Sequence, residues 1–252
     1  MSGAQYDQES MIRAAEALRS SRGAVVLTGA GISVESGIPD FRSPGGIWSK
    51  YPPEEYATID AFYANPDRVW ELWYELADSL RGVKPNPAHF ALAELEEMGV
   101  VQAVITQNID ALHFHGGSVN VVEYHGNMDW LVCPACHRRR KLDLDQRALG
   151  APRCECGGYM KPDIVLFGEV IPHQALHHAD TLARRCGVFM VVGTSALVYP
   201  AAHLPRLAKE NGAVVIECNT SPTGLTDGVT DIFLEGPAGV TLPALARLVR
   251  GE

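Results

Sequence analysis

The chain has 252 residues, of which 46% are hydrophobic and 20% charged, and its formal net charge is −9. This length can bury a full core with room for a modest second lobe, while no apolar run is long enough to span a bilayer. The acidic balance argues against a nucleic-acid binder, and the N-terminus lacks the apolar core of a signal peptide, so we expect a cytoplasmic monomer with no membrane partner and no direct nucleic-acid partner.

Helical patterns and apolar runs alternate along the chain. The first helix is predicted near the N-terminus, where one face carries Met11, Ile12, Ala15 and Leu18. Short apolar runs predict buried strands at 24–27, 100–107, 119–125, 188–195 and 213–219. Helical patterns that close on glycine, a usual helix stop, lie at 85–99, 173–187 and 199–212. This alternation predicts an α/β fold in which helices cover both faces of a parallel sheet.

Ligands of parallel sheets bind beyond the carboxyl ends of the strands. Four residues fall at such ends: Thr28, Thr106, Gly193 and Asn219. We expect these positions to meet at one site.

Two segments interrupt the alternation of strands and helices. Residues 43–84 are rich in aromatics and have a mostly helical pattern, and residues 131–163 contain four cysteines. Together they could form a smaller lobe inserted into the sheet domain.

The segment 28–42, with the sequence TGAGISVESGIPDFR, is the most informative of the chain. Two glycines one residue apart let the backbone turn sharply and come close to a ligand. The residues that follow can open a helix whose free N–H groups favour phosphate. A glycine and a proline then stop any long helix, so that Asp40, Phe41 and Arg42 are expected to lie beside the same ligand. A loop that serves only hydride transfer has no evident need for this aromatic and arginine, so we expect it to handle the chemistry of its cofactor.

Four of the six cysteines lie in one short segment: Cys133, Cys136, Cys154 and Cys156. The first pair has the spacing of a zinc knuckle, in which two thiolates on a tight turn bind one tetrahedral metal ion. The second pair is one residue shorter than the usual spacing, but two glycines follow it and allow a turn under a metal. The four sulfur ligands predict a closed structural zinc site, with a redox pair or unrelated thiols as the alternatives. Cys186 and Cys218 are predicted to be buried free thiols.

Two more motifs end predicted strands. The sequence TQNID at 106–110 places polar side chains at a sheet edge, where they could hold a ribose, a water and a carboxamide. The alternative is a plain helix cap formed by Asn108 or Asp110. The sequence EYHGN places His125 beside a glycine as a candidate general base, with a purely structural histidine as the alternative.

Two later segments are extended and partly apolar, and a substrate peptide could add between them as a strand. They lie at 161–169 and 198–200. The residues expected to contact substrate are Val165, Phe167, Gly168, Glu169, Val198 and Tyr199.

Taken together, the TGAGIS and SGIPDFR runs, TQNID, the histidine of EYHGN, the four cysteines, KPDIVLFGE, GTS and the late asparagine resemble the sirtuin (Sir2) family of NAD-dependent protein deacylases. The matches occur in family order over roughly residues 20–220. The resemblance implies a discontinuous Rossmann-like NAD-binding domain and a small domain of a helical module and a zinc ribbon. The large domain would comprise 1–42, 85–130 and 164–252, and the small domain 43–84 and 131–163.

The resemblance also implies the chemistry. NAD and an acyl-lysine peptide would enter the cleft from opposite sides, nicotinamide would leave, and the acyl group would end on ADP-ribose. His125 would be the base, Asn108 and Asp110 would order the nicotinamide ribose, and Phe41 would shield the reactive sugar. The four cysteines would hold zinc away from the chemistry. The full set implied to bind NAD is Gly29, Ala30, Gly31, Ser33, Val34, Asp40, Phe41, Arg42, Gln107, Asn108, Ile109, Asp110, Gly193, Thr194, Ser195 and Asn219.

One departure bears on the substrate. The subgroup of the family specialised for succinyl and malonyl lysine has an alanine, then a tyrosine and an arginine further along the helix. Ala57 fits the alanine, but by spacing the other two positions are Trp73 and Leu76. Without the arginine, an acidic acyl group would be buried unpaired at a cost of several kcal/mol. Acetyl and other neutral acyl groups are therefore predicted.

Three other functions compete with deacylation. The same activated sugar could be transferred to a different nucleophile by a mono-ADP-ribosyltransferase, although the intact His125 favours deacylation. A zinc-ribbon protein could bind a nucleotide and recruit partners without catalysis, but pure binding does not require His125, Asn108 and Asp110 together. A plain dehydrogenase fits least, because the spacing from Gly29 does not give GxGxxG.

Overall fold

A six-stranded sheet forms the centre of the larger part of the protein. The computed structural model describes residues 7–41 and 45–252. The strands of the large sheet are β1 Ala24–Thr28, β2 Val101–Thr106, β3 Val121–Glu123, β7 Val188–Val192, β8 Val214–Asn219 and β9 Ile232–Glu235. Their order is β3-β2-β1-β7-β8-β9, and every neighbouring pair is parallel. The strand order reverses between β1 and β7, which is where sheets of this kind bind ligands.

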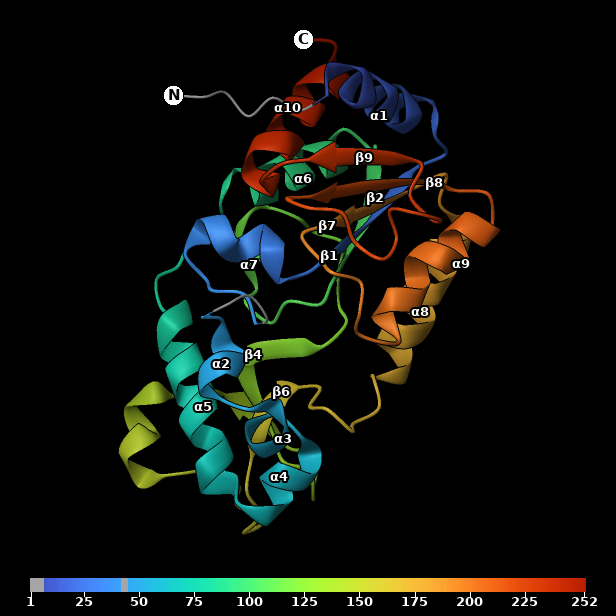
Figure 1. The fold of residues 1–252 in the computed structure, drawn as a ribbon. Helices are drawn as coiled ribbons and strands as arrows, with labels where there is room; N and C mark the ends of the chain where they lie inside the picture. Colours follow the sequence, from blue (N-terminus) through green and yellow to red (C-terminus); the bar gives the residue numbers. More distant parts are fainter. Residues whose placement is uncertain (1–6, 42–44) are drawn as a thin grey trace.

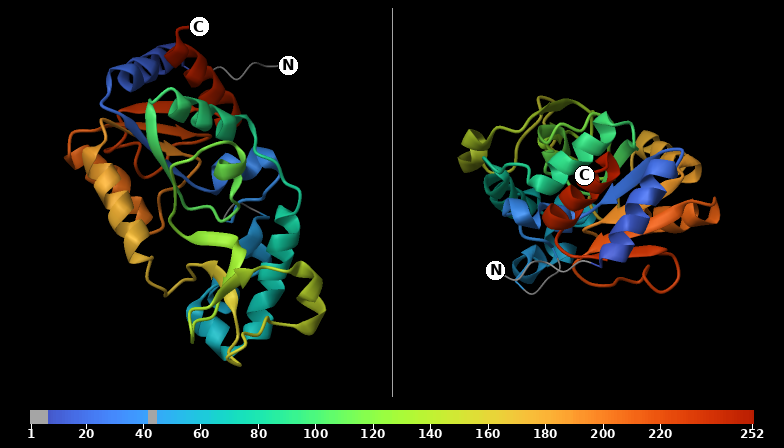
Figure 2. Two further views of the ribbon diagram at one scale, coloured as in Figure 1. Left: turned by 180° about the vertical axis from the view of Figure 1, so that it is seen from behind. Right: turned by 90° about the horizontal axis from the view of Figure 1, so that it is seen from above.

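Helices cover both faces of this sheet, as the sequence predicts (Figures 1 and 2). The helices on one face are α1 Gln8–Ser20, α6 Pro87–Glu97 and α10 Ala238–Arg250. The helices on the other face are α8 His173–Arg185 and α9 Leu204–Glu210. Side chains of β1 alternate between the two cores: Val26 packs in the first and Leu27 in the second. All five residues of β1 are buried, because both faces of a covered parallel sheet are removed from water.

A second, smaller sheet lies below the first in Figure 1 and packs against a group of helices. Its strands are β4 Gly126–Val132, β5 Arg139–Lys141 and β6 Lys161–Ile164, in the antiparallel order β5-β4-β6. The helices of this part are α2 Ile47–Lys50, α3 Pro53–Tyr56, α4 Ile59–Ala64 and α5 Pro66–Leu80. The remaining short elements are α7 Leu112–His115 and the 3₁₀ helices η1 Ala30–Ser36, η2 Leu144–Leu149 and η3 Ala201–His203.

A third core joins α5 to the small sheet. Trp70, Trp73 and Tyr74 of α5 belong to the same buried cluster as Leu131 of β4 and Ile164 of β6. The division of the chain predicted from the resemblance would place α5 and Leu131 of this cluster in the small domain but Ile164 in the large one. Its boundaries at 130/131 and 163/164 fall inside β4 and β6, which pair with each other.

Several sequence predictions differ from the structure. Ile12 is 43% exposed, because the buried stripe of α1 consists of Met11, Ala14, Ala15 and Leu18, at positions i, i+3, i+4 and i+7. The strand predicted at 119–125 is only three residues long. Strand β9 and helix α10 have no counterpart among the predicted elements. No described helix has the length and apolar character needed to cross a membrane.

Candidate active site and zinc site

A cavity of about 630 Å³ opens at the carboxyl edge of the large sheet, at the point where the strand order reverses. Loops that follow β1, β2, β7 and β8 form one end of its wall. The segment from Ile164 to Ile171, together with Trp48, Ala57 and Trp73, forms the other end. The cavity thus has a polar end built from strand-end loops and an apolar end built from the smaller part of the protein.

Close backbone contacts hold the loop after β1 in place. The Gly29 N–H donates to the Val192 carbonyl at 3.1 Å, and the Gly31 N–H donates to the Gly193 carbonyl at 2.8 Å. A Cβ atom on Gly31 would lie 2.7 Å from the Gly193 oxygen. The two glycines are therefore required by the neighbouring β7 loop, a constraint that the sequence does not reveal. The helix predicted after them is the 3₁₀ helix η1, which ends at Gly37 with a φ of 91°.

Residues of the 28–42 segment separate into three groups. Gly29, Ala30, Gly31, Asp40 and Phe41 line the cavity. The rings of Phe41 and Trp48 pack at a tilt with their centroids 5.0 Å apart, and the Trp48 and Phe167 ring centroids are 6.3 Å apart. These three aromatic rings form one wall. Ser33 and Val34 do not line the cavity. Ser33 is buried, and Val34 is 45% exposed on the protein surface. Arg42 lies outside the described residues.

Ser33 connects two of the predicted catalytic residues. Its hydroxyl donates to Asp110 Oδ2 at 2.7 Å and accepts from Asn108 Nδ2 at 3.1 Å. The other oxygen of Asp110 accepts the Leu112 N–H at the start of α7, so this carboxylate also acts as the helix cap that the alternative interpretation predicts. Asn108 lies on the cavity wall, whereas Asp110 lies behind it. Asp110 is thus placed to hold Ser33 and Asn108 rather than to contact a ligand in this conformation.

The other strand-end residues surround the polar end of the cavity. Gln107 Nε2 donates to Thr194 Oγ1 at 3.0 Å, and Asn219 Nδ2 donates to the Thr194 carbonyl at 3.2 Å. These bonds join the loops after β2, β7 and β8 into one rim. The predicted residues present on this rim are Gln107, Asn108, Ile109, Gly193, Thr194, Ser195 and Asn219.

His125 lies on the cavity wall between β3 and β4. Its Nδ1 is 3.1 Å from the Gln107 carbonyl, which can only accept, so Nδ1 carries the proton and Nε2 is left as a free acceptor. Burial lowers the pKa of His125 below its usual 6.5, and the bond to Gln107 raises it by less. The imidazole is therefore neutral at pH 7 and is able to accept a proton at Nε2.

The segment after β6 is tied to His125 and to the helical module through its backbone. The Val165 N–H donates to the His125 carbonyl at 2.9 Å, and the Phe167 N–H donates to the Ala57 carbonyl at 2.9 Å. Lys161 is only 6% exposed; its Nζ donates to the Ile164 carbonyl at 2.6 Å and pairs with Glu169 at 2.9 Å. All of the residues predicted to contact substrate lie on the cavity wall: Val165, Phe167, Gly168, Glu169, Val198 and Tyr199.

Three buried groups support the site without having been singled out from the sequence. His113 Nε2 lies 2.9 Å from Thr28 Oγ1, which also donates to Thr106 Oγ1. Burial lowers the pKa of His113 to about 3 and that of His89, whose ring is 5.0 Å away, to about 4. Glu217 is fully buried on β8. The signal for its role would have been Thr223, Thr226 and Thr230, which follow it in the loop after β8.

Glu217 organises the loop after β8. Its carboxylate accepts hydrogen bonds from Thr223 at 2.6 Å, Thr226 at 2.9 Å and Thr230 at 2.7 Å, and also from Asn219 Nδ2 at 3.1 Å. Residues Thr220 to Gly224 of this loop line the polar end of the cavity. One buried carboxylate therefore fixes both a loop and an amide of the cavity rim.

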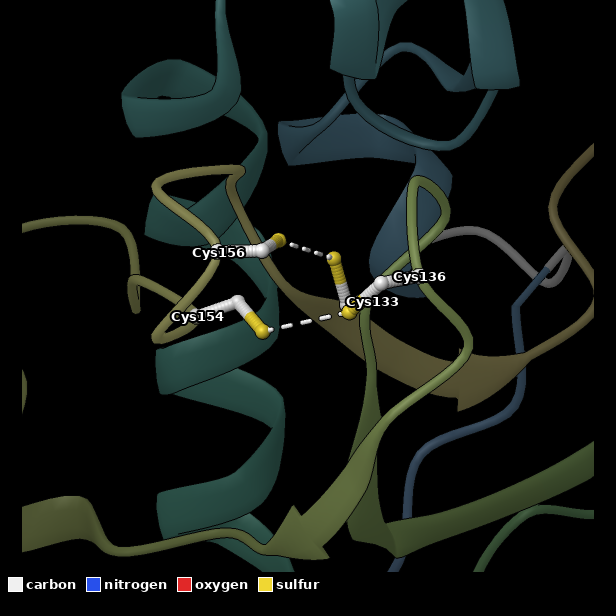
Figure 3. A group of neighbouring side chains, drawn as sticks. All are labelled: Cys133, Cys136, Cys154 and Cys156. Atoms are coloured by element: carbon white, nitrogen blue, oxygen red, sulfur yellow. Dashed lines mark hydrogen bonds between the residues drawn. The ribbon is translucent and has the colours of Figure 1, made fainter.

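The four cysteines of the small sheet point toward one another from two loops (Figure 3). Their Sγ atoms all lie within 4.8 Å of one another, with 3.6 Å between Cys133 and Cys156 and 3.5 Å between Cys136 and Cys154. A zinc tetrahedron with Zn–S bonds of about 2.3 Å has edges of about 3.8 Å, so the four sulfurs fit this ion. Burial raises the pKa of Cys133, but hydrogen bonds from the N–H groups of Cys136 and Ala135 and from the neighbouring thiols of Cys156 and Cys136 together outweigh it and lower the pKa to about 7. The shortened second pair thus does not prevent a zinc site.

This site is remote from His125. Strand β4 has seven residues and separates His125 from Cys133, a span of roughly 20 Å. Four sulfur ligands leave no open position for a substrate, which is typical of structural zinc. Cys186 and Cys218 are buried free thiols, as predicted.

Fold and site together define an α/β enzyme that binds a nucleotide at the switch point of its sheet and carries a zinc ribbon. The family model described as "Sir2 family" matches residues 29–200. The chain is 49% identical over 248 residues to "NAD-dependent protein deacylase 2" of Archaeoglobus fulgidus, covering 96% of this chain and 97% of the relative. It is 45% identical over 246 residues to "NAD-dependent protein deacylase" of Pyrococcus abyssi, covering 95% and 98%. The chain belongs to the Sir2 family.

Solved structures agree with this assignment. A structure described as "Structural Basis for the Mechanism and Regulation of Sir2 Enzymes" superposes with a TM-score of 0.90 at 48% identity, covering 97% of this chain and 99% of that one. A Sir2 homologue–NAD complex gives a TM-score of 0.89 at 40% identity, covering 95% and 93%. Sir2Af2 bound to a myristoylated histone peptide gives 0.82 at 44% identity, covering 97% and 98%.

Proposed function

We propose that this protein is an NAD-dependent protein-lysine deacetylase that prefers neutral acyl groups over succinyl and malonyl groups. Membership of the Sir2 family makes it an NAD-dependent protein deacylase. In the overall reaction, acyl-lysine, NAD and water give free lysine, nicotinamide and O-acyl-ADP-ribose. The observation that carries the proposal is His125, which lies on the cavity wall and whose Nδ1 bonds to the Gln107 carbonyl, so that Nε2 is the nitrogen left to accept a proton.

The polar end is suited to the nucleotide. Backbone N–H groups, hydroxyls and amides line it, and Thr194 and Asn219 stand at its rim, where the adenosine half would bind. Phe41 would cover the sugar on the side facing the aromatic wall. NAD supplies an activated ribose carbon and nicotinamide as the leaving group. The residues of this chain would bind and orient the nucleotide, and His125 Nε2 would accept a proton from a ribose hydroxyl.

The apolar end is suited to an uncharged acyl chain. Ala57, Trp73 and Phe167 contribute to it, and the only ionisable carboxylates on the described wall are Asp40 and Glu169. No lysine or arginine lies on that described wall, and Leu76, at the expected arginine position, is buried. An acyl carboxylate would be desolvated there without a cation, at a cost of several kcal/mol.

The zinc site would act structurally. Cys133, Cys136, Cys154 and Cys156 would hold the ion and crosslink the two loops of the small sheet. Their distance from His125 leaves the reaction to the cavity residues.

The test is product analysis on acetyl-, butyryl- and succinyl-lysine peptides, with and without NAD, by mass spectrometry. We expect NAD-dependent loss of acetyl and butyryl groups and slow loss of succinyl. His125→Ala should lower the rate by about 10²- to 10⁴-fold, as for loss of a general base. The matched control is His178→Ala, at an exposed position of α8. ADP-ribosylated peptide without acyl loss would favour a mono-ADP-ribosyltransferase, and fast desuccinylation would contradict the acyl preference.

A further inference from the structure

Asn86 carries a buried amide next to the loop that follows β1. It immediately precedes α6, is 5% exposed and does not line the cavity. Pro87, the first residue of α6, restricts Asn86 to the extended backbone conformation that it adopts. Because α6 packs in the first core through Ala88, Ala91 and Leu92, the amide is presented from a rigid element.

The Asn86 side chain does more than cap its helix. Its Oδ1 accepts the Ala88 N–H at 2.9 Å, which is the bond of an ordinary N-cap. Its Nδ2 donates to two groups of η1, the Ile32 carbonyl at 2.7 Å and the Ser36 hydroxyl at 3.0 Å. A helix cap needs only an acceptor, so capping does not account for the two donated bonds.

A second asparagine cap makes the difference visible. Asn65 precedes α5, and its Oδ1 accepts the Arg68 N–H at 3.1 Å. Asn65 is exposed, and its Nδ2 donates to none of the described residues. The two caps are alike in their acceptor and differ in their donor. The donated bonds are thus specific to the cap that contacts η1.

The two bonds from Asn86 anchor η1 before and after Ser33. η1 is a seven-residue 3₁₀ helix, and 3₁₀ helices of this length are uncommon because the geometry of their hydrogen bonds is poor. Between the two anchors, the Ser33 hydroxyl accepts from Asn108 Nδ2 at 3.1 Å. Ala30, at the start of η1, lines the cavity. A shift of η1 would therefore change both the cavity wall and the contact between Ser33 and Asn108.

We propose that Asn86 is a positioning residue for NAD: its amide holds η1 where Ala30 meets the nucleotide and Ser33 meets Asn108. The inference rests on the proposed deacylase function, in which NAD occupies the polar end of the cavity. Asn86 itself touches neither substrate. When its donated bonds are lost, the fully buried Ile32 is left with an unpaired carbonyl, and η1 is free to leave the position that the nucleotide needs.

The experiment removes the donor and keeps the cap. Asn86→Asp retains the shape of the side chain and the oxygen that caps α6, and Asn86→Ser retains a cap that carries no charge. KM for NAD, from initial rates, and the dissociation constant of ADP-ribose, from calorimetry, should both rise in Asn86→Asp. The expected rise is about tenfold, the effect of one lost hydrogen bond whose buried partner is left unpaired. Asn86→Ser should raise both constants in the same direction, while KM for the acetyl-lysine peptide stays near its wild-type value.

Asn65→Asp is the matched control, because it makes the same exchange at an exposed cap and should leave both nucleotide constants unchanged. A purely structural role of Asn86 would lower Tm and kcat without changing either constant. If Asn86→Asp does not fold, the constants of Asn86→Ser decide.

The proposal is overturned if the folded Asn86 variants keep the wild-type constants, if KM for the peptide rises as much as KM for NAD, or if Asn65→Asp has the same effect. A wild-type protein that binds ADP-ribose but does not deacylate the peptide would contradict the proposed function. In that case the ADP-ribose constants of the variants would still decide the role of Asn86.

Discussion

The two ends of the cavity are built in different ways. The polar end is held by backbone: Gly29 and Gly31 donate to the β7 strand and its loop, and Glu217 fixes the loop after β8. The apolar end is held by side-chain packing of aromatic residues from α2, α5 and the segment after β6, and the Trp73 Nε1 there has no hydrogen-bond partner among the described residues. A rigid backbone suits NAD, which would be the same in every reaction. At the apolar end, single side chains can be substituted to fit different acyl groups.

The largest effect should come from zinc removal, which acts on the apolar end alone. Structural zinc in small domains contributes on the order of 10 kcal/mol to folding. Cys133→Ser should therefore abolish deacylation while nucleotide affinity, measured by calorimetry with ADP-ribose, falls much less. An equal loss of deacylation and of ADP-ribose affinity would contradict the view that the two ends of the cavity are held independently. Cys186→Ser, outside the cluster, is the control.

Gly31→Ala should be the most damaging small change at the polar end. Its Cβ would lie 2.7 Å from the Gly193 oxygen, so the loops after β1 and β7 must separate. Overpacking of this kind costs about 1–3 kcal/mol. We expect KM for NAD to rise by roughly tenfold or more, measured by initial rates, with KM for the peptide changed less. Gly228→Ala, where no atom lies near the added Cβ, should be neutral.

The buried histidines behind the polar end predict how stability depends on pH. His89 and His113 are neutral in the folded state because their pKa values are lowered to about 4 and about 3. Between these values and 6.5 the unfolded chain binds more protons, so the free energy of unfolding falls as the pH is lowered. Two such groups contribute up to about 2.7 kcal/mol per pH unit. Urea melts from pH 7 to pH 4.5 would measure this slope. His113→Asn should reduce it, and an unchanged slope would contradict the assignment.

Glu217→Gln should have the smallest effect, and it should be confined to the nucleotide. The amide keeps the shape of the carboxylate but can no longer accept from three threonines and Asn219 at once. We expect KM for NAD to increase a few-fold, about 1 kcal/mol, while kcat on saturating NAD changes little. The control is Glu235→Gln, at an exposed position of β9. A fall in kcat without a change in KM would be inconsistent with a positioning role.

The same contrast explains how much of the site could be predicted from the sequence. The polar end consists of contiguous motifs at strand ends, so residues such as Gly31, Asn108 and Thr194 could be placed from local patterns. The placement of Asp110 behind the wall could not, because it depends on Ser33 reaching it from another loop. Likewise, whether a tryptophan N–H is paired depends on which carbonyl lies opposite: Met160 for Trp70 and, within residues 7–41 and 45–252, none for Trp73.

The helices and strands that the sequence does not predict also have local explanations. Helix α10 contains Pro243 and begins between glycines, and such residues usually indicate a loop. Strands β5 and β6 of the small sheet have only three and four residues, and the buried positions of the seven-residue β4 do not alternate strictly, so none of these strands gives a clear pattern of alternation. Strand β9 has only four residues and follows a polar loop whose order depends on the buried Glu217.

The most direct test of the central claim is the stoichiometry of products from one turnover mixture of acetyl-lysine peptide and NAD. Nicotinamide, free lysine peptide and O-acetyl-ADP-ribose should appear in equal amounts, and none should form in His125→Ala beyond a trace. Acetyl loss as free acetate without release of nicotinamide, or nicotinamide release with the acetyl group still on the peptide, would contradict the account.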